Sequence, residues 1–160
     1  MNHIFLETNG DLYQIENVNK YITFVNGKCD LITCDGGFDY SGDYNNQENN
    51  SYKLIYSEIF TSLNIQNIDG TLIIKVFDII YYRTIQLIYL LYNLYSEIYI
   101  YKPTLSRLSN SEKYIICKGF NGFPENLCRM MELHFQDCEN FLIDIPDSFI
   151  KDINNYNNIY

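Results

Sequence analysis

The residues that decide the fold are 30–37, DLITCDGG, and 71–78, TLIIKVFD. Each stretch opens with a short apolar run, which is typical of a strand buried in a parallel sheet. The first run ends at Asp35, and the two glycines after it allow the backbone to turn sharply. We predict two buried strands, with Asp35 directly after the first and Lys75 near the end of the second.

Segments with helical periodicity surround these strands. Apolar residues recur at helical spacing in residues 16–26 and 53–65, and residues 85–95 are apolar on all sides, which favours a buried helix. Two more helices are expected at residues 124–135 and 147–156.

Shorter signals fill the gaps between these elements. Residues 3–7 are a candidate for a short strand, the Asn-rich residues 43–50 predict a loop, and Asp69 with Gly70 predicts a turn.

Two further strands, residues 97–102 and 113–118, complete the predicted sheet. The linker between them, residues 103–112, is ten residues long, whereas a helical crossover takes about a dozen residues or more. These strands should therefore pair antiparallel. The whole pattern predicts a doubly wound α/β sheet that ends in an antiparallel hairpin.

Three charged residues should meet at one edge of this sheet. Ligands of such sheets bind beyond the carboxyl ends of the parallel strands, where Asp35 and Lys75 are expected. Glu112 begins a strand that runs the opposite way, so it falls at the same edge. We expect the three side chains to lie close together.

Composition limits the chain to one compact domain. It has 160 residues, of which 47% are hydrophobic, and a net charge of -9 that argues against binding nucleic acid by bulk charge. Residues 75–118 alone carry net positive charge, although a solvated surface is the simpler interpretation of scattered lysines. With 23 isoleucines, 20 asparagines and no alanine, the composition indicates an AT-rich genome, weakly that of a large DNA virus.

The cysteines and the hydropathy indicate a reducing compartment. Five cysteines are an odd number, and residues 1–10 do not resemble a secretory leader, so we expect a cytoplasmic protein, in a virion or viral factory if the source is viral. The longest uncharged apolar stretch, residues 84–96, has 13 residues against about 20 for a bilayer span. We expect no membrane helix. Cys128, His134 and Cys138 fit no standard zinc spacing, so we expect them to be structural rather than metal ligands.

Five ordered motifs carry a family resemblance. They are CDGGFD (34–39), NNQE (45–48), IIKVFD (73–78), KPTLSR (102–107) and NSEKYIICKGF (110–120). This series resembles the FtsJ-like 2′-O-ribose methyltransferases, and looks closest to their Adrift-type cap-methylating branch and its large-DNA-virus relatives. The resemblance implies a Rossmann-like sheet, S-adenosylmethionine as cofactor and the capped 5′ end of mRNA as substrate.

The resemblance also assigns roles to residues. Asp35, Lys75 and Glu112 match three members of the family's Lys-Asp-Lys-Glu tetrad, with Lys75 as general base. Asp11, in Asn9-Gly10-Asp11, matches the aspartate that contacts the cofactor adenine, and Asp35 also lies at the cofactor. Structurally, Lys75 could instead be a strand-end lysine that only pairs with a carboxylate.

Residues after the hairpin's first strand are candidates for RNA contacts. Arginine forks suit phosphate oxygens, so Lys102 and Arg107 fit this role, together with Ser111, while ordinary exposed charges are the alternative. Tyr40 and Tyr44 could stack on a base, but packing within their loop is the simpler interpretation.

The front of the chain departs from the family pattern. The family's glycine-rich cofactor loop, first tetrad lysine and first two strands have no counterpart here, which would leave a gap in the sheet. We expect residues 1–120 to be the C-terminal two-thirds of a methyltransferase domain and residues 121–160 a helical extension. The sequence would then be a piece of a longer protein; a degraded copy that serves as an inactive RNA-binding or scaffold module is the alternative.

Overall fold

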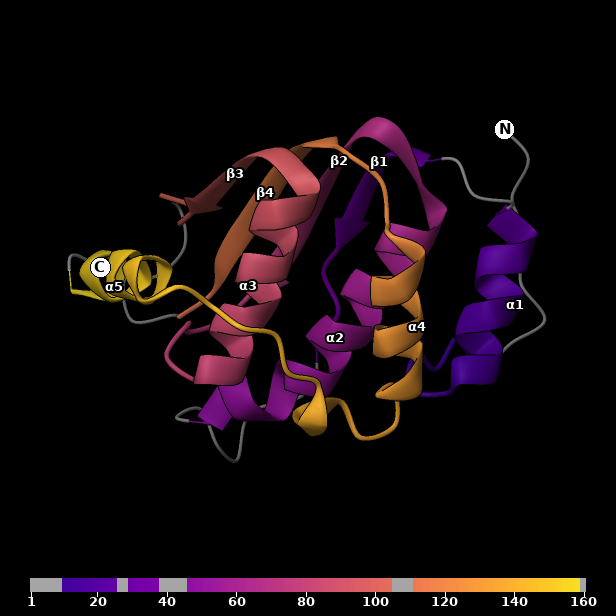
Figure 1. Ribbon diagram of the computed structural model, residues 1–160, viewed down its shortest axis with the longest axis horizontal. Helices are drawn as coiled ribbons and strands as arrows, with labels where there is room; N and C mark the ends of the chain where they lie inside the picture. The colour runs from indigo at the N-terminus through magenta and orange to yellow at the C-terminus, as the bar shows by residue number, and fades with distance from the viewer. Residues whose placement is uncertain (1–9, 26–28, 38–45, 105–110, 159–160) are drawn as a thin grey trace.

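The computed structural model describes residues 10–25, 29–37, 46–104 and 111–158. Strands and helices alternate through the first three-quarters of the chain, and helices follow (Figure 1). The elements are α1 (Ile15–Val25), β1 (Cys29–Cys34), α2 (Gln47–Ile65), β2 (Gln66–Val76), α3 (Tyr82–Leu94), β3 (Tyr95–Tyr101), β4 (Lys113–Phe120), α4 (Glu125–Leu133), a 3₁₀ turn (Cys138–Asn140) and α5 (Asp147–Asn157).

The four described strands form one mixed sheet in the order β1-β2-β4-β3. β1 and β2 run parallel, and β4 runs antiparallel to both of its neighbours, β2 and β3. The α/β class and the antiparallel hairpin predicted from the short linker are therefore confirmed. No described strand lies on the other side of β1.

The described helices α2 and α3 cover the same face of the sheet, in front of it in Figure 1. The side chains that face them, among them Leu72, Ile74, Ile115 and Cys117, are fully buried. Right-handed crossovers explain this arrangement, because β1-α2-β2 and β2-α3-β3 advance across the sheet in one direction. A doubly wound sheet has helices on both faces. Within the described residues, α2 and α3 supply the helices of one face.

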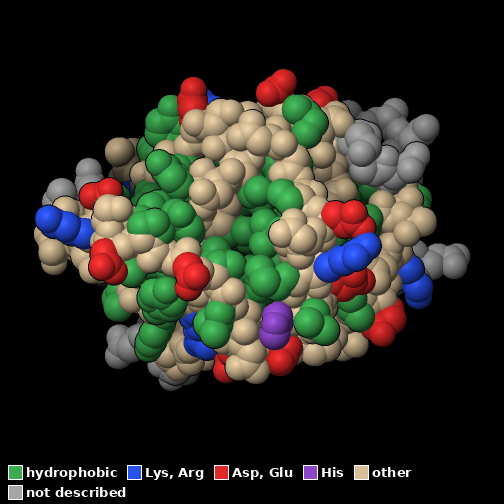
Figure 2. Space-filling view, in the orientation of Figure 1, with side chains coloured by type: hydrophobic (Ala, Val, Ile, Leu, Met, Phe, Trp, Pro, Cys, Tyr) green, Lys and Arg blue, Asp and Glu red, His purple; other side chains and the backbone are tan. Residues whose placement is uncertain are grey.

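Lys and Arg side chains are scattered over the described part of the helix-covered face. Figure 2 shows them set singly among acidic ones, while hydrophobic side chains gather near the middle of this face. No described helix has the length and hydropathy needed to span a bilayer.

Two predicted boundaries were wrong. α2 begins at Gln47, so residues 47–50 are helical instead of a loop. Asp69 and Gly70 do not precede β2 but lie inside it. They form a bulge there, since the pairing jumps from Cys29 opposite Gln66 to Leu31 opposite Thr71, and Asp69 has a φ of 63°. The strand predicted at residues 3–7 lies outside the described residues.

The C-terminal elements pack against α2 and α3. The Tyr56 hydroxyl donates a hydrogen bond to the Met131 carbonyl (2.8 Å), and the rings of Phe135 and Phe141 meet the Tyr56 ring edge-on. These side chains belong to the same buried cluster as the sheet residues. The helices after β4 therefore share the core of the α/β unit.

A buried carboxylate joins the start of α2 to the start of α3. Glu48 is 6% exposed, and its carboxylate accepts hydrogen bonds from the backbone N–H groups of Ile80 (2.9 and 3.1 Å) and Tyr81 (2.8 Å). Backbone N–H groups near a helix N-terminus lack partners within the helix, and a negative charge there is favourable. This contact explains why α2 extends back into the Asn-rich segment.

Replacing Glu48 by Ala should lower the free energy of unfolding by about 1–3 kcal/mol, because the N–H groups of Ile80 and Tyr81 would lose their acceptor. Glu48→Gln keeps an acceptor and should cost less. Urea denaturation measures the change, with Asn49→Ala, an exposed position on the same helix, as the control. Equal stability of the Ala and Gln variants would contradict the capping role.

Candidate active site

Asp35 and Lys75 meet at the carboxyl ends of the two parallel strands. The Lys75 Nζ lies 2.7 Å from Asp35 Oδ1 and also donates a hydrogen bond to the Asp35 carbonyl (3.3 Å). The lysine side chain is 15% exposed and the aspartate side chain 67%. An ammonium that is mostly buried is thus held by a carboxylate open to solvent.

Glu112 reaches the same place through Tyr114. Tyr114 lies opposite Lys75 in the pairing of β2 with β4, and its hydroxyl donates a hydrogen bond to Glu112 Oε1 (3.1 Å). Burial, the hydrogen bond to Glu112 and the negative charges of Glu112 and Asp35 raise the pKa of Tyr114 to about 12. Both acids therefore act on one tyrosine beside Lys75: Asp35 contacts Lys75 directly, and Glu112 contacts Tyr114. No sequence signal pointed to Tyr114.

The predicted RNA-contact residues lie beside Glu112. The Lys102 Nζ donates a hydrogen bond to the Glu112 carbonyl (2.9 Å), and the Ser111 hydroxyl donates one to Gln47 Oε1 (3.2 Å). Burial and the charge of Lys113 lower the pKa of Lys102, against the attraction of Glu112 and Asp78. Arg107 lies outside the described residues.

Glu58 is a functional candidate that sequence reasoning missed. It lies on α2, is 6% exposed, and its Oε1 accepts a hydrogen bond from the Gly36 N–H (3.0 Å). Burial raises the pKa of Glu58 to about 7, while the Gly36 hydrogen bond and the charge of Lys75 oppose the shift and Asp35 adds to it. The sequence held one signal for Glu58. It follows Leu54 by four residues and Ile55 by three, which puts an acid on the apolar side of the helix.

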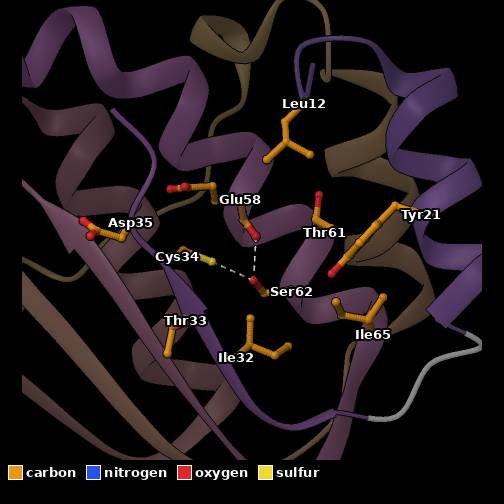
Figure 3. Close-up of a pocket in the computed structure, with 10 residues that line it drawn as sticks. All are labelled: Leu12, Tyr21, Ile32, Thr33, Cys34, Asp35, Glu58, Thr61, Ser62 and Ile65. Atoms are coloured by element: carbon orange, nitrogen blue, oxygen red, sulfur yellow. Dashed lines mark hydrogen bonds between the residues drawn. The ribbon is translucent and has the colours of Figure 1, made fainter. Parts of the chain in front are cut away.

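Two hollows flank Glu58. One, of about 200 Å³, lies between α1, β1 and α2; Figure 3 shows Tyr21 from α1, Ile32 and Cys34 from β1 and Glu58 from α2 around it. The other, of about 330 Å³, is lined by Gly10, Asp11, Leu12, Tyr13, Gly36, Gly37, Leu54 and Glu58. Asp11, predicted from sequence to bind a cofactor, therefore lines the second hollow together with the Asp35–Gly37 turn.

The profile of FtsJ-like methyltransferases matches residues 2–120. The chain belongs to the FtsJ-like methyltransferase family. Members of this family transfer methyl groups from S-adenosylmethionine to RNA ribose 2′-hydroxyls.

Distant homologues include cap-specific enzymes. The cap-specific mRNA (nucleoside-2′-O-)-methyltransferase 1 of Bos taurus is 34% identical over 119 residues, which are 71% of this chain and 14% of that protein. The enzyme of the same name from Trypanosoma brucei brucei is 29% identical over 152 residues, 91% of this chain and 41% of that protein. The chain thus spans well under half of the length of these relatives.

Solved structures share the fold. A ribosomal RNA methyltransferase of Plasmodium falciparum superposes with a TM-score of 0.52 at 24% identity, covering 76% of this chain and 63% of that chain. An alphavirus P23pro-zbd structure gives 0.53 at 16% identity, covering 75% and 19%. Both likenesses show the fold alone.

The residues around the second hollow fit one wall of an S-adenosylmethionine site. A Cβ at position 36 would lie 2.5 Å from Glu58 Oε1, so glycine lets the turn lie close against α2. Asp11 adds a carboxylate to the lining, and its Oδ1 also accepts the Tyr13 N–H (2.9 Å). These groups suit a cationic, polar ligand that approaches the backbone closely.

Cys128, His134 and Cys138 lie in the C-terminal part of the chain, on and after α4. Within the described ranges, no three His, Cys, Asp or Glu side chains are grouped to hold an ion. Cys128 contacts Asn64 Oδ1 (3.5 Å), Cys138 is buried, and His134 lies 3.4 Å from Asp137. The contacts of these three residues are thus with the surrounding protein.

The free energy of unfolding of Glu58→Gln, taken relative to the wild type, should be higher at pH 8 than at pH 5. Because the folded-state pKa of about 7 lies above the usual 4.5, the folded protein binds more protons than the unfolded chain between these values, and stability falls as pH rises through them. The neutral amide escapes this loss, which amounts to roughly 2–4 kcal/mol. Urea denaturation at both pH values measures it, with Glu132→Gln at an exposed position as control. A pH-independent difference would contradict the raised pKa.

Proposed function

We propose that this protein is an mRNA cap 2′-O-ribose methyltransferase in which Lys75 is the general base. The observation that carries the proposal is the meeting of Lys75 with Asp35 at 2.7 Å on the rim where Tyr114 brings Glu112. Asp35 contacts Lys75 directly, and Glu112 is hydrogen-bonded to Tyr114, which lies opposite Lys75 in the sheet. The names of the homologues support the capped substrate.

Removal of a proton is the step that the protein's own residues must perform. A ribose 2′-hydroxyl is a weak nucleophile, and a neutral lysine can take its proton as the new bond forms. Asp35 and Glu112 favour the ammonium form, so their role is to orient Lys75 and the hydroxyl rather than to activate the amine. S-adenosylmethionine, when bound, supplies the methyl group.

RNA contacts extend the site along the rim. Lys102 and Ser111 lie next to Glu112, and their cationic and hydroxyl groups suit phosphate oxygens. Arg107, in the same segment, completes the proposed set. An RNA that lies along this edge would contact Lys102 as well as Lys75.

An inactive RNA-binding or scaffold module is the second candidate. It is favoured by the edge of β1, which no described strand covers, and by the contact of the Lys75 amine with the Asp35 carboxylate. Cofactor affinity separates the two candidates.

S-adenosylmethionine should bind in the hollow lined by Asp11 and Gly36, and calorimetry should detect it with the longest protein in which this sequence occurs. Asp11→Asn should weaken binding about tenfold, since a hydrogen bond to a charged group contributes about 1.5–3 kcal/mol. Asp30→Asn, at the far end of β1, is the control. Absence of any cofactor affinity would favour the scaffold.

Lys75→Ala should lower methyl transfer to capped RNA at least about 100-fold while cofactor affinity stays unchanged, because general-base catalysis is lost. Tritium transfer from labelled S-adenosylmethionine measures turnover. Lys118→Ala is the matched control, since Lys118 lies on β4, faces the same side of the sheet and is exposed. Turnover retained by Lys75→Ala would rule out its role as the base.

A further inference from the structure

One turn of α2 holds the end of β1 through two atoms of Glu58. Its carboxylate Oε1 accepts the Gly36 N–H at 3.0 Å. Its backbone carbonyl accepts the Ser62 hydroxyl at 2.7 Å, and the Ser62 oxygen in turn lies 3.3 Å from the Cys34 Sγ (Figure 3). Residues on both sides of Asp35 are therefore attached to the same helical turn.

The attachment brings the backbone of the turn close to α2. A Cβ at position 36 would lie 2.5 Å from Glu58 Oε1 and 2.9 Å from the Leu54 Cδ2. Apart from this contact, the Asp35–Gly37 turn is held at its other side by Lys75, whose Nζ binds both the carboxylate and the carbonyl of Asp35. Asp35 itself is largely exposed, so these two attachments fix its position.

We propose that Glu58 is a positioning residue of the methyl transfer, which holds the Asp35–Gly37 turn so that Asp35 meets Lys75. The inference rests on the proposed function for its catalytic meaning, and on the contacts of Glu58 for its structural part. Glu58 lines the second hollow, and its carboxylate is hydrogen-bonded to the Gly36 N–H, so it acts on Asp35 through the backbone of the turn. Displacement of a catalytic group by about 1 Å can lower a rate about 100-fold.

The charged and titratable groups that face Glu58 come from every neighbouring segment. They are Cys34 and Asp35 at the end of β1, Lys75 on β2, Tyr21 on α1, and Asp11 and Tyr13 ahead of α1. Burial raises the pKa of Glu58 to about 7, so its charge changes near neutral pH. Since a hydrogen bond to a carboxylate is stronger than one to a neutral acid, the Gly36 amide should report this titration.

The experiment follows the Gly36 amide resonance by NMR in the full chain between pH 5 and 9. In the wild type it should shift with an apparent pKa near 7, and in Glu58→Gln it should not titrate there, although the amide oxygen still accepts the N–H. Glu58→Leu removes the acceptor, so the resonances of residues 35–37 should shift or broaden, whereas Glu58→Gln should leave them in place. Glu48→Gln, at the other buried carboxylate of α2, should retain the titration.

Turnover then tests the catalytic meaning. Glu58→Leu should lower methyl transfer about tenfold or more, and Glu58→Gln should restore most of it at pH 8. Failure of the two proposals can be told apart: if no variant, wild type included, transfers methyl groups, the proposed function fails while the Gly36 titration remains. If Gly36 does not titrate near pH 7, or if Leu and Gln variants behave alike, the positioning role is wrong.

Discussion

The register of β1 against β2 is the constraint on which the candidate site depends. Cys34 lies opposite Ile74, which leaves Asp35, one residue past the end of β1, beside Lys75. A slip by one residue would turn the side chains of β1 to the other face. Burial prevents this slip, because Ile32 and Cys34 pack toward the core on the side covered by α2. The contact between Asp35 and Lys75 is thus fixed by hydrophobic packing on the opposite face of the sheet.

The antiparallel strand β4 brings residues to this edge that a parallel strand would place at the other end. Because β4 starts where β1 and β2 finish, Glu112 and Lys113 arrive at the rim together. Lys113 is buried and pairs with Asp78 (3.1 Å), which follows β2. The start of β4 is therefore attached to the segment after Lys75, and Tyr114 faces Lys75 in a fixed orientation.

Features that depend on local sequence could be predicted, whereas features that depend on contacts between distant residues could not. Strand-end charges are a local signal, and they predicted the contact of Asp35 with Lys75. The short linker before Lys113 is another, and it predicted the antiparallel hairpin. Glu58 makes its decisive contact with a residue 22 positions away, and helical spacing indicates burial without naming a partner. The start of α2 was missed for the same reason, since Glu48 is held by N–H groups more than 30 residues further along the chain.

Negative charge near Lys75 opposes its use as a general base, and the burial of Glu58 reduces that charge. Asp35, Glu112 and Glu58 would all favour the ammonium if each were ionised, yet a general base needs the neutral amine. Asp35 is open to water, which screens its charge, whereas Glu58 is enclosed between β1 and α2. Its raised pKa leaves it partly protonated near pH 7, so it holds the turn through Gly36 with less negative charge than an exposed acid would add. The burial of Glu58 therefore lowers folding stability at high pH. It also supplies a positioning contact to Gly36 that adds little negative charge near Lys75.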